Sequence, residues 1–250
     1  DLYERDGTEN KCKNINCVNP GSATIKWNNS TMNNFRWCEL NVWDYTIMDR
    51  NLWATKSWDG VITPTVSSDF IWYHYQWWNN YGFDPNKTPA ISEELPIRGT
   101  SDWYSNDKFI QTIYPVWNSD ASASDVWSQW PCPNGRHVPS RNEWIDVYNT
   151  IGNNVSTWIS KLFVPRAGYR YSYTTTVDYL GSFGVYWSST LDSTTDAYYL
   201  FFNNNGVDVE DYNNRSNGYS VRCFKWQSQI PINSTLLLSP GQWWTSWELS

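Results

Sequence analysis

VYWSSTLDSTTDAYYLFFNNNGVDVEDYNNRSNGYSVRCFK, residues 185–225, is the stretch that decides the fold class of this chain. It holds four short segments rich in aromatic and β-branched residues, and such segments predict β-strands at 185–190, 197–203, 207–210 and 219–225. Asn and Gly cluster between the later segments, where they favour the tight turns that join neighbouring antiparallel strands. The sequence therefore predicts a small antiparallel sheet.

The strand at 197–203 has two chemically different faces. A period of two places Leu200 and Phe202 on one face and Tyr199 and Phe201 on the other. The residues expected to face the core are Trp187, Tyr198, Leu200, Phe202, Val207, Val209 and Val221. Tyr199 and Phe201 are then expected to lie exposed, as adjacent rings of a contact patch. The alternative is that an insert or the C-terminal tail covers them.

Two helices are expected before this sheet. Ser140 and Glu143 form a capping box, in which each side chain bonds to the backbone of the other residue. Apolar residues follow at helical spacing until Gly152, which is typical of a helix end. A second, shorter helix is predicted where Val155, Trp158, Ile159 and Leu162 share one side. Helices placed before a run of strands predict an α+β protein.

The pattern divides the chain into three parts. Residues 1–40 are polar and are expected to form an irregular N-terminal segment. Residues 41–226 are expected to form one domain, with a long irregular insert at about 84–124 that contains several prolines. Residues 227–250 are expected to form an aromatic C-terminal tail.

Charge and composition exclude some partners. The formal charge is −7 and no run of Lys or Arg occurs, whereas binding to nucleic-acid phosphates requires clustered positive charge. No apolar stretch approaches the roughly 20 residues that span a bilayer. The chain contains 19 Trp and 17 Tyr, and such rings serve both cores and contact surfaces. Because the chain begins at Asp1, we expect an ectodomain whose signal or anchor lies elsewhere.

The sequence leaves the oxidation state and the pairing of the five cysteines open. They form no CxxC pair and only two His are present, so a structural zinc site is not expected. In an oxidising compartment Cys132 and Cys223 are one candidate pair, and closing a loop of about 90 residues would contribute roughly 4–5 kcal/mol. In a reducing cell all five would remain buried free thiols.

An ordered series of motifs resembles a known family. The motifs are Cys132-Pro-Asn-Gly-Arg-His-Val-Pro-Ser140, Tyr186-Trp-Ser-Ser-Thr190 and Gly218-Tyr-Ser-Val-Arg-Cys223. Together they resemble the Fibrobacter succinogenes major paralogous domain, a family with a C-type-lectin-like fold that includes variable proteins of diversity-generating retroelements. The resemblance covers roughly residues 42–225, and the chain departs from it at both ends and in the insert.

The resemblance implies a fold and a binding face. Two helices would pack against a small twisted antiparallel sheet, and Cys132 and Cys223 would both flank that sheet and be able to pair. The stretch between the second and third motifs would be the diversified one. The implied ligand-binding residues are Leu191, Asp192, Ser193, Asp196, Tyr199, Phe201, Asn203, Asn204, Asn205, Asp208, Glu210, Asp211, Tyr212 and Asn214.

The chain lacks the sequence signals of the related catalytic and metal-dependent classes. A calcium-dependent lectin needs Glu-Pro-Asn or Gln-Pro-Asp with Trp-Asn-Asp, and none of these strings occurs. His74 lies among aromatic residues, which predicts a packed rather than a catalytic imidazole, and His137 precedes the capping box in a loop. We therefore expect no enzyme and no cofactor.

Two functions remain. The first is a diversity-generating retroelement variable protein that displays residues 191–217 as a diversified binding face. The second is a fixed carbohydrate-binding or adhesin module whose exposed rings stack on sugars. In either case the expected partner is a protein or glycan on another cell or surface. The expected location is extracellular, or a cell or virion surface.

Overall fold

The computed structural model describes the side chains of residues 37–52, 54, 73–92, 108–110, 131–174 and 176–225, and the backbone of the strands before residue 37. The helices are α1 (Arg141–Ile151) and α2 (Val155–Leu162). The strands are β1 (Tyr3–Asp6), β2 (Glu9–Cys12), β3 (Val18–Trp27), β4 (Ser30–Val42), β5 (Tyr45–Met48), β6 (His74–Gln76), β7 (Gly82–Phe83), β8 (Ile91–Ser92), β9 (Phe109–Ile110), β10 (Arg136–His137), β11 (Tyr169–Arg170), β12 (Val177–Asp178), β13 (Gly184–Leu191), β14 (Asp196–Phe202), β15 (Val207–Asn214), β16 (Gly218–Tyr219) and β17 (Phe224–Lys225).

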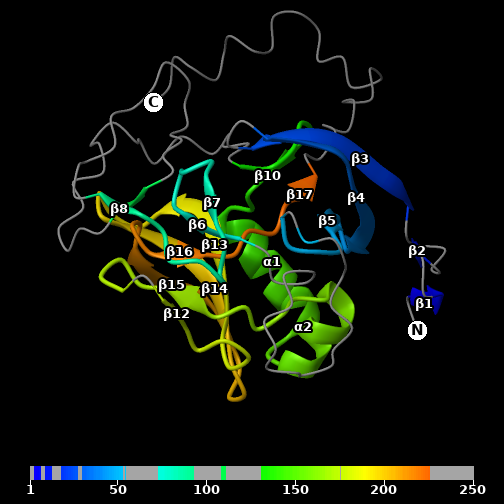
Figure 1. Ribbon diagram of the computed structural model, residues 1–250. Coiled ribbons are helices and arrows are strands. Elements are labelled where there is room, and N and C mark those ends of the chain that lie inside the picture. The colour runs from blue at the N-terminus through cyan, green and yellow to red at the C-terminus, as the bar shows by residue number, and fades with distance from the viewer. Residues whose placement is uncertain are drawn as a thin grey trace, which may run out of the picture.

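The strands form several small sheets rather than the single sheet that the sequence predicts. Two of them have five strands each, in the orders β10-β17-β5-β4-β3 and β12-β11-β16-β6-β7, and a third is the meander β13-β14-β15. Figure 1 shows the two helices beside the meander, with the β3–β4 hairpin at the opposite end of the molecule. The pairings within these three sheets are antiparallel, and strands outnumber helices. This arrangement confirms the α+β class.

The prediction of an irregular segment at residues 1–40 is wrong for much of its length. β3 and β4 form a long antiparallel hairpin, and β4 also pairs with β5 over four residue pairs. Backbone pairing with a neighbouring strand stabilises an extended conformation whatever the side chains prefer, so polar strands of low intrinsic propensity still form. The polar composition of residues 1–40 therefore gave no indication of β3 and β4, which form this long hairpin.

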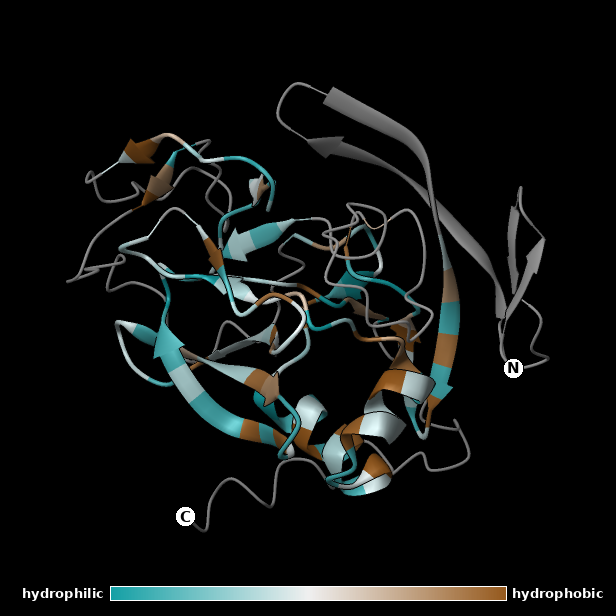
Figure 2. Ribbon diagram, turned by 60° about the horizontal axis from the view of Figure 1, so that its bottom comes forward, coloured by the Kyte–Doolittle hydropathy of each residue, from teal (hydrophilic) through white to brown (hydrophobic). Residues whose placement is uncertain are grey.

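Both predicted helices are present, with the expected ends. The Ser140 hydroxyl oxygen accepts from the Glu143 backbone N–H at 3.2 Å, and Glu143 Oε2 accepts from the Ser140 backbone N–H at 2.7 Å. Helix α1 ends at Gly152, whose φ of 80° suits a residue without a Cβ. In α2 the buried residues are Trp158 and Leu162, and hydrophobic bands recur along both helices in Figure 2. The capping-box prediction is confirmed.

The meander β13-β14-β15 has a buried cluster on each of its faces. On the helix-facing side, Leu200 and Phe202 pack with Trp144 of α1 and Trp158 of α2. On the other side, which we call the aromatic side, Tyr199 belongs to a second cluster. The further members of that second cluster include Trp187, Trp77, Tyr169, Tyr219 and Val221. The sheet is therefore sandwiched, and neither face is simply open to solvent.

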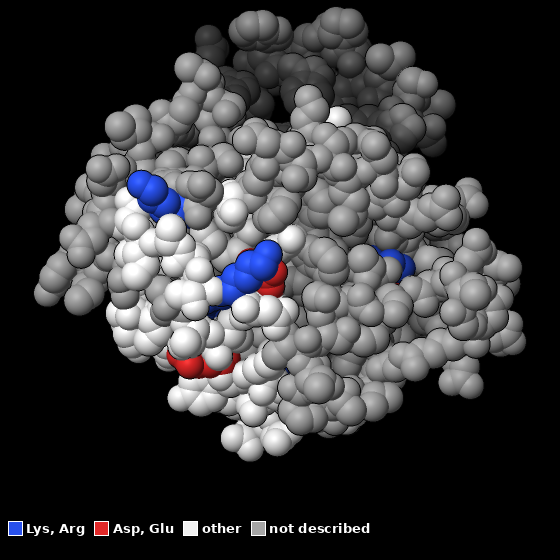
Figure 3. Space-filling view, viewed as in Figure 1, with Lys and Arg blue, Asp and Glu red and all other residues white. Residues whose placement is uncertain are grey.

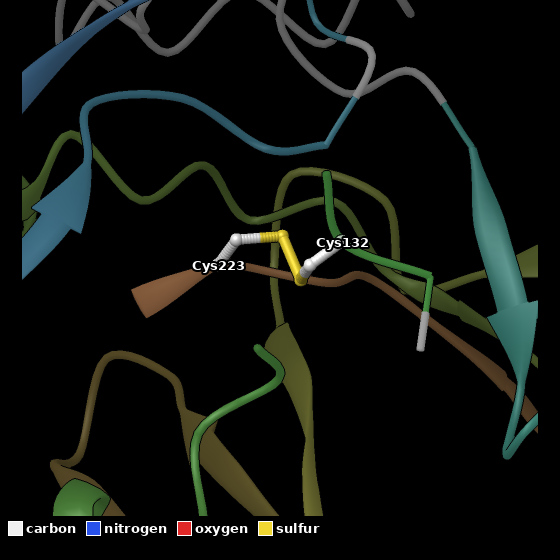
Figure 4. Close-up of a disulfide and its surroundings, with 2 residues drawn as sticks. All are labelled: Cys132 and Cys223. Carbon is white, nitrogen blue, oxygen red and sulfur yellow. A yellow bond between two sulfur atoms is a disulfide. The ribbon is translucent and has the colours of Figure 1, made fainter. Parts of the chain in front are cut away.

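A disulfide and a buried arginine tie distant segments together. Cys132 and Cys223 are bonded, with Cα atoms 5.8 Å apart and a sequence separation of 91, which confirms that pairing (Figure 4). Cys38 is also disulfide-bonded. The guanidinium of Arg222, fully buried, donates to Met48 O and Leu162 O at 2.8 Å and to Phe163 O at 3.0 Å. The last two carbonyls end α2, where a cation complements the helix dipole.

Two side chains hold the described parts of the insert against the domain. The side-chain amide of Gln76, in β6, donates to Ile110 O at 2.9 Å and accepts from Ile110 N–H at 3.0 Å. It therefore bonds to the backbone of β9 as a neighbouring strand would. Arg170 donates to the carbonyls of Asp84 and Lys87. Residues 84–92 and 108–110 are thus docked, while the rest of the insert and the tail at 227–250 lie outside the described residues. Neither described helix is long and apolar enough to cross a membrane.

Candidate functional site

The predicted exposure along β14 is only partly correct. Leu200 and Phe202 are fully buried on the helix-facing side, and Trp187, Val207, Val209 and Val221 are buried as well. Tyr199, however, is only 7 % exposed and Phe201 is half-buried, while Tyr198, expected in the core, is half-buried. The prediction of an exposed Tyr199 is therefore wrong.

The rings that cover Tyr199 and Phe201 come from neighbouring strands of the domain. The ring of Tyr219 lies 5.1 Å from that of Tyr199, and the ring of Phe183 lies 5.1 Å from that of Phe201, measured between centroids. Both covering residues belong to segments around the meander, at β16 and immediately before β13. Single-strand alternation places the two rings on the correct face but carries no information about a second layer above it.

A β-bulge changes the faces on which the residues of β15 lie. Tyr199 pairs with Asp211 and Phe201 with Asp208, so Val209 and Glu210 stand together opposite Leu200. Residues directly opposite each other project from the same face. The bulge therefore puts Asp208 and Asp211 both on the aromatic side and moves Tyr212 to the helix-facing side, beside Tyr198. Without the bulge, simple alternation would place Asp208, Glu210 and Tyr212 together on one face.

The remaining predicted residues lie at opposite ends of the meander. Asp192, Ser193 and Asp196 form a self-bonded turn, in which Asp192 N–H donates to Asp196 O at 3.0 Å. Asn214 pairs with Asp196 at this end, and Leu191 is half-buried against the core. Asn203, Asn204 and Asn205 make the β14–β15 turn at the other end, close to Asn153 between the helices (Figure 1). The fourteen predicted residues therefore do not form one continuous patch.

Two of the predicted acidic residues, together with Asn213, cap the backbone of β15. The N–H groups of Glu210, Tyr212 and Asn214 donate to the side-chain oxygens of Asp208, Asp211 and Asn213, at 2.8–2.9 Å. The Val207 N–H donates to Asn153 at 2.7 Å. These contacts satisfy donors that an edge strand would otherwise offer to a further strand. Glu210 also forms an ion pair with Arg141, whose guanidinium lies over the Tyr198 ring.

A continuous band of rings lies on the aromatic side, beside β11 and β12. We call it the aromatic surface, and its members in order of contact are Tyr173, Tyr171, Tyr169, Tyr179, Phe183 and Phe201. The successive ring centroids lie 4.9, 4.5, 5.7, 4.4 and 5.1 Å apart. Tyr173 is 57 % exposed and Tyr179 52 % exposed, so two large rings of the band face solvent. Exposed rings that belong to one continuous aromatic patch mark contact surfaces more often than isolated ones do.

The turn that carries Tyr179 is fixed in place. Tyr179 has a φ of 54°, in the left-handed region, which costs an ordinary residue roughly 1–2 kcal/mol. The Tyr179 carbonyl accepts from Ser182 N–H and Phe183 N–H, both at 3.0 Å, and Gly181 N–H donates to Arg166 O at 2.8 Å. The rings of Tyr179 and Phe183 then stack at an angle of 5°. A strained residue held by several bonds is a feature that often accompanies binding sites.

A polar layer lies beneath these rings. The Tyr199 hydroxyl donates to Asp211 Oδ2 at 2.6 Å, and the Asn217 amide donates to the Tyr219 hydroxyl at 3.2 Å and to Asn213 Oδ1 at 3.1 Å. Burial raises the pKa of Tyr199 well above its usual range, and the bond to Asp211 raises it further. Burial likewise raises the pKa of Tyr219. Both hydroxyls therefore stay protonated across the physiological range, and that of Tyr199 remains a donor to Asp211.

Residues 145–224 match a family described as "Domain of unknown function (DUF8237)". The match spans less than half of the chain, from the interior of α1 to β17, and so includes the meander and the whole aromatic surface. Comparison with curated proteins and with solved structures finds no match.

The histidines and their neighbours have structural partners. His74 is fully buried, as predicted, and its Nε2 lies 3.2 Å from Ala167 O. His137 Nε2 lies 2.8 Å from Glu143 Oε1, and the Ser140 hydroxyl donates to the same carboxylate rather than to the imidazole. Burial alone would raise the pKa of Glu143, but the bonds from His137 and Ser140 outweigh it and lower that pKa. Among the described residues no group of three or more His, Cys, Asp or Glu is arranged to hold a metal ion.

The sequence contains a signal for part of the aromatic surface. Tyr169, Tyr171 and Tyr173 alternate with polar residues, which predicts three rings on one face of a strand. Tyr179 and Phe183 gave no such signal, because a turn of defined shape brings them to the same face. On the face shown in Figure 3 most of the described surface is uncharged, and its charged side chains occur in small separate groups.

Proposed function

We propose that this protein is a non-enzymatic ligand-binding module that binds a glycan on its aromatic surface. The observation that carries the proposal is the band of six rings in contact, two of which, Tyr173 and Tyr179, are more than half exposed; several hydrogen bonds fix the turn that carries Tyr179. Aromatic rings that are already fixed in position before the ligand binds contribute contact area at little cost in conformational entropy. The apolar faces of sugar rings stack on such rings.

The proposal includes the fold family and the location. Support for a C-type-lectin-like fold comes from the order of the sequence motifs, from two helices packed on one side of a meander, and from the bond between Cys132 and Cys223. Support for an extracellular, cell-surface or virion-surface location comes from the disulfides, which persist in oxidising compartments.

The test uses two tyrosines that are almost equally exposed. Tyr179 is 52 % exposed on the aromatic surface and Tyr212 is 53 % exposed on the helix-facing side. The intact chain and the variants Tyr179→Ala and Tyr212→Ala are applied to a glycan array, and the affinity for any bound glycan is then measured by calorimetry. We expect Tyr179→Ala to weaken binding by about tenfold or more, as the loss of a central aromatic contact does. Tyr212→Ala should bind as the parent does.

Two results would contradict the proposal. If both variants bind the glycan as the parent does, the aromatic surface is not the binding site. If no glycan on the array is bound, glycans are excluded as the ligand class. Thermal unfolding of both variants checks that each is folded. A loss confined to Tyr212→Ala would instead favour a site on the predicted face at residues 191–217.

A specific observation favours a second candidate, the diversity-generating retroelement variable protein. Within residues 191–217, the side chains of Asp192, Ser193, Asn204, Asn205 and Tyr212 are exposed, and exposed positions of this kind tolerate replacement. Tyr199 argues against diversification of every implied position, since it is buried and hydrogen-bonded. The discriminating observation is a nearby copy of the coding region that differs only at adenines; its absence from the surrounding genome would end this candidate.

A further inference from the structure

Carboxylates flank the aromatic surface. Asp178 pairs with Tyr169 across β11 and β12, so its side chain projects from the same face as that ring. On the opposite border, Asp208 pairs with Phe201 and Asp211 with Tyr199, and both carboxylates belong to exposed residues. The bulge in β15 is what brings the last two to one face. Three negative charges therefore lie around the rings, on two different strands.

Carboxylates act on an exposed ring of the aromatic surface and on two buried rings beside it, and Asp178 also interacts with the guanidinium of Arg170. The negative charge of Asp178 acts on Tyr173, and that of Asp211 acts on Tyr199 and on Tyr219. Tyr173 and Tyr179 are the exposed rings of the aromatic surface, and the face of an aromatic ring carries negative charge density. A cation beside an aromatic face is attracted by the ring, and nearby carboxylates add to that attraction, whereas an anion is repelled by both.

We propose that the aromatic surface selects glycans that carry ammonium groups, such as polymers of an unacetylated amino sugar, over neutral and acidic glycans. The inference rests on the proposed function, since it concerns the charge of the ligand at the same site. Stacking on the rings supplies affinity for any sugar of suitable shape. Asp178, Asp208 and Asp211 supply the discrimination by charge.

A matched pair of ligands isolates the charge. The tetramer of β-1,4-linked glucosamine and the tetramer of N-acetylglucosamine share length and linkage, and they differ in the positive charge that acetylation removes. Binding of each to the intact chain is measured by calorimetry at about pH 6, below the range in which ordinary amines lose their proton. We expect the charged tetramer to bind about tenfold more tightly at low salt, with the difference shrinking as salt is added.

Variants test the discrimination at two of the three carboxylates. Asp178→Asn and Asp208→Asn, alone and together, should reduce the ratio of the two affinities and leave binding of the neutral tetramer unchanged. Glu210→Gln is the control, because it removes the same charge from β15 at a residue that pairs with Arg141 rather than facing the rings. It should leave the ratio unchanged. Asp211 is not varied here, since its carboxylate accepts from Tyr199.

The outcomes separate this inference from the proposed function. Equal affinities for the two tetramers, or a preference for oligogalacturonate, would overturn the charge inference and leave glycan binding intact. Failure of every glycan to bind would remove both proposals. Tetramethylammonium is a further probe: if it binds as tightly as the charged tetramer, the surface recognises a cation without regard to sugar, which overturns the assignment to amino sugars.

Discussion

The two faces of the meander β13-β14-β15 are buried by different kinds of contact. On the helix-facing side the contacts of Leu200 and Phe202 are apolar and the residues are fully buried. On the aromatic side Tyr199 is buried too, but its hydroxyl is bonded to Asp211, and the rings continue outward to exposed Tyr173 and Tyr179. The helix-facing side therefore contributes mainly to stability, whereas the aromatic side retains hydrogen-bonded polar groups and solvent-exposed rings. A single strand contributes to both.

The largest expected difference lies between two neighbouring phenylalanines. Phe202→Ala on the helix-facing side should destabilise the protein by about 3–5 kcal/mol, because it leaves a cavity among packed helix residues. Phe201→Ala on the aromatic side should cost only about 1–2 kcal/mol, because that ring is half-buried and its loss leaves space that solvent can fill. Urea unfolding of the two variants measures both values.

If Phe202→Ala does not fold, Phe202→Leu gives the milder form of the same test. Equal losses at positions 201 and 202 would contradict the comparison, since they would mean that both faces are sealed to the same extent. A greater loss at Phe201 would make the aromatic side the main core.

The disulfide belongs to the cluster on the aromatic side. Cys132 and Cys223 both pack with Trp187 and Tyr219 there. Replacing both cysteines with Ala should destabilise the protein by about 2–5 kcal/mol, because it releases a loop of 91 residues in the unfolded chain. The melting temperature with and without a reductant checks this. A double variant as stable as the parent would show that packing alone holds the aromatic side together.

His74 is expected to make the aromatic side sensitive to acid. Burial lowers the pKa of His74 to about 3, and the charge of Arg170 acts in the same direction. Because the folded pKa lies below the unfolded value of about 6.5, the stability that neutral His74 confers is present above pH 6.5 and is lost as the pH falls toward 3. Between pH 7 and pH 4 this loss should amount to about 3 kcal/mol. Urea unfolding at the two pH values measures it, and His74→Gln should lack this part of the loss.

An independent measurement removes the risk that His74→Gln fails to fold. The chain has two histidines, so the imidazole signals in an NMR titration of the parent can be assigned with His137→Gln. We expect the His74 signal to stay unchanged down to about pH 4. A midpoint near the ordinary value of about 6.5 would contradict the burial argument.

Local sequence chemistry predicted the elements well and the layers poorly. The capping box at Ser140 and the burial of Leu200 and Phe202 depend on residues close in sequence, and both predictions are confirmed, whereas Tyr198 of the same predicted set is half-buried. The burial of Tyr199 depends on Tyr219, which is twenty residues away, and the face of Tyr212 depends on a single bulge. Alternation cannot reveal either. For the same reason the hairpin β3–β4, which pairing with β5 supports, was missed in a polar segment.

The smallest expected effect concerns the hydroxyls of two neighbouring tyrosines. Tyr199→Phe removes the bond to Asp211 on the aromatic side and should cost about 1–2 kcal/mol at neutral pH, since the acceptor is a carboxylate. Tyr198→Phe on the other side is the control: its hydroxyl also bonds to a carboxylate, that of Asp192, but at a half-exposed position, so its loss should change stability by less than about 0.5 kcal/mol. Urea unfolding again gives both values.

The pH dependence of the Tyr199→Phe effect identifies its cause. Because burial and Asp211 raise the pKa of Tyr199, its contribution to stability is fully present below the unfolded value of about 10 and is lost as the pH rises above it. The stability gap between the parent and Tyr199→Phe should therefore narrow above pH 10. A gap that stays constant would mean that the hydroxyl is not a buried donor, and the aromatic side would then differ from the helix-facing side only in its exposed rings.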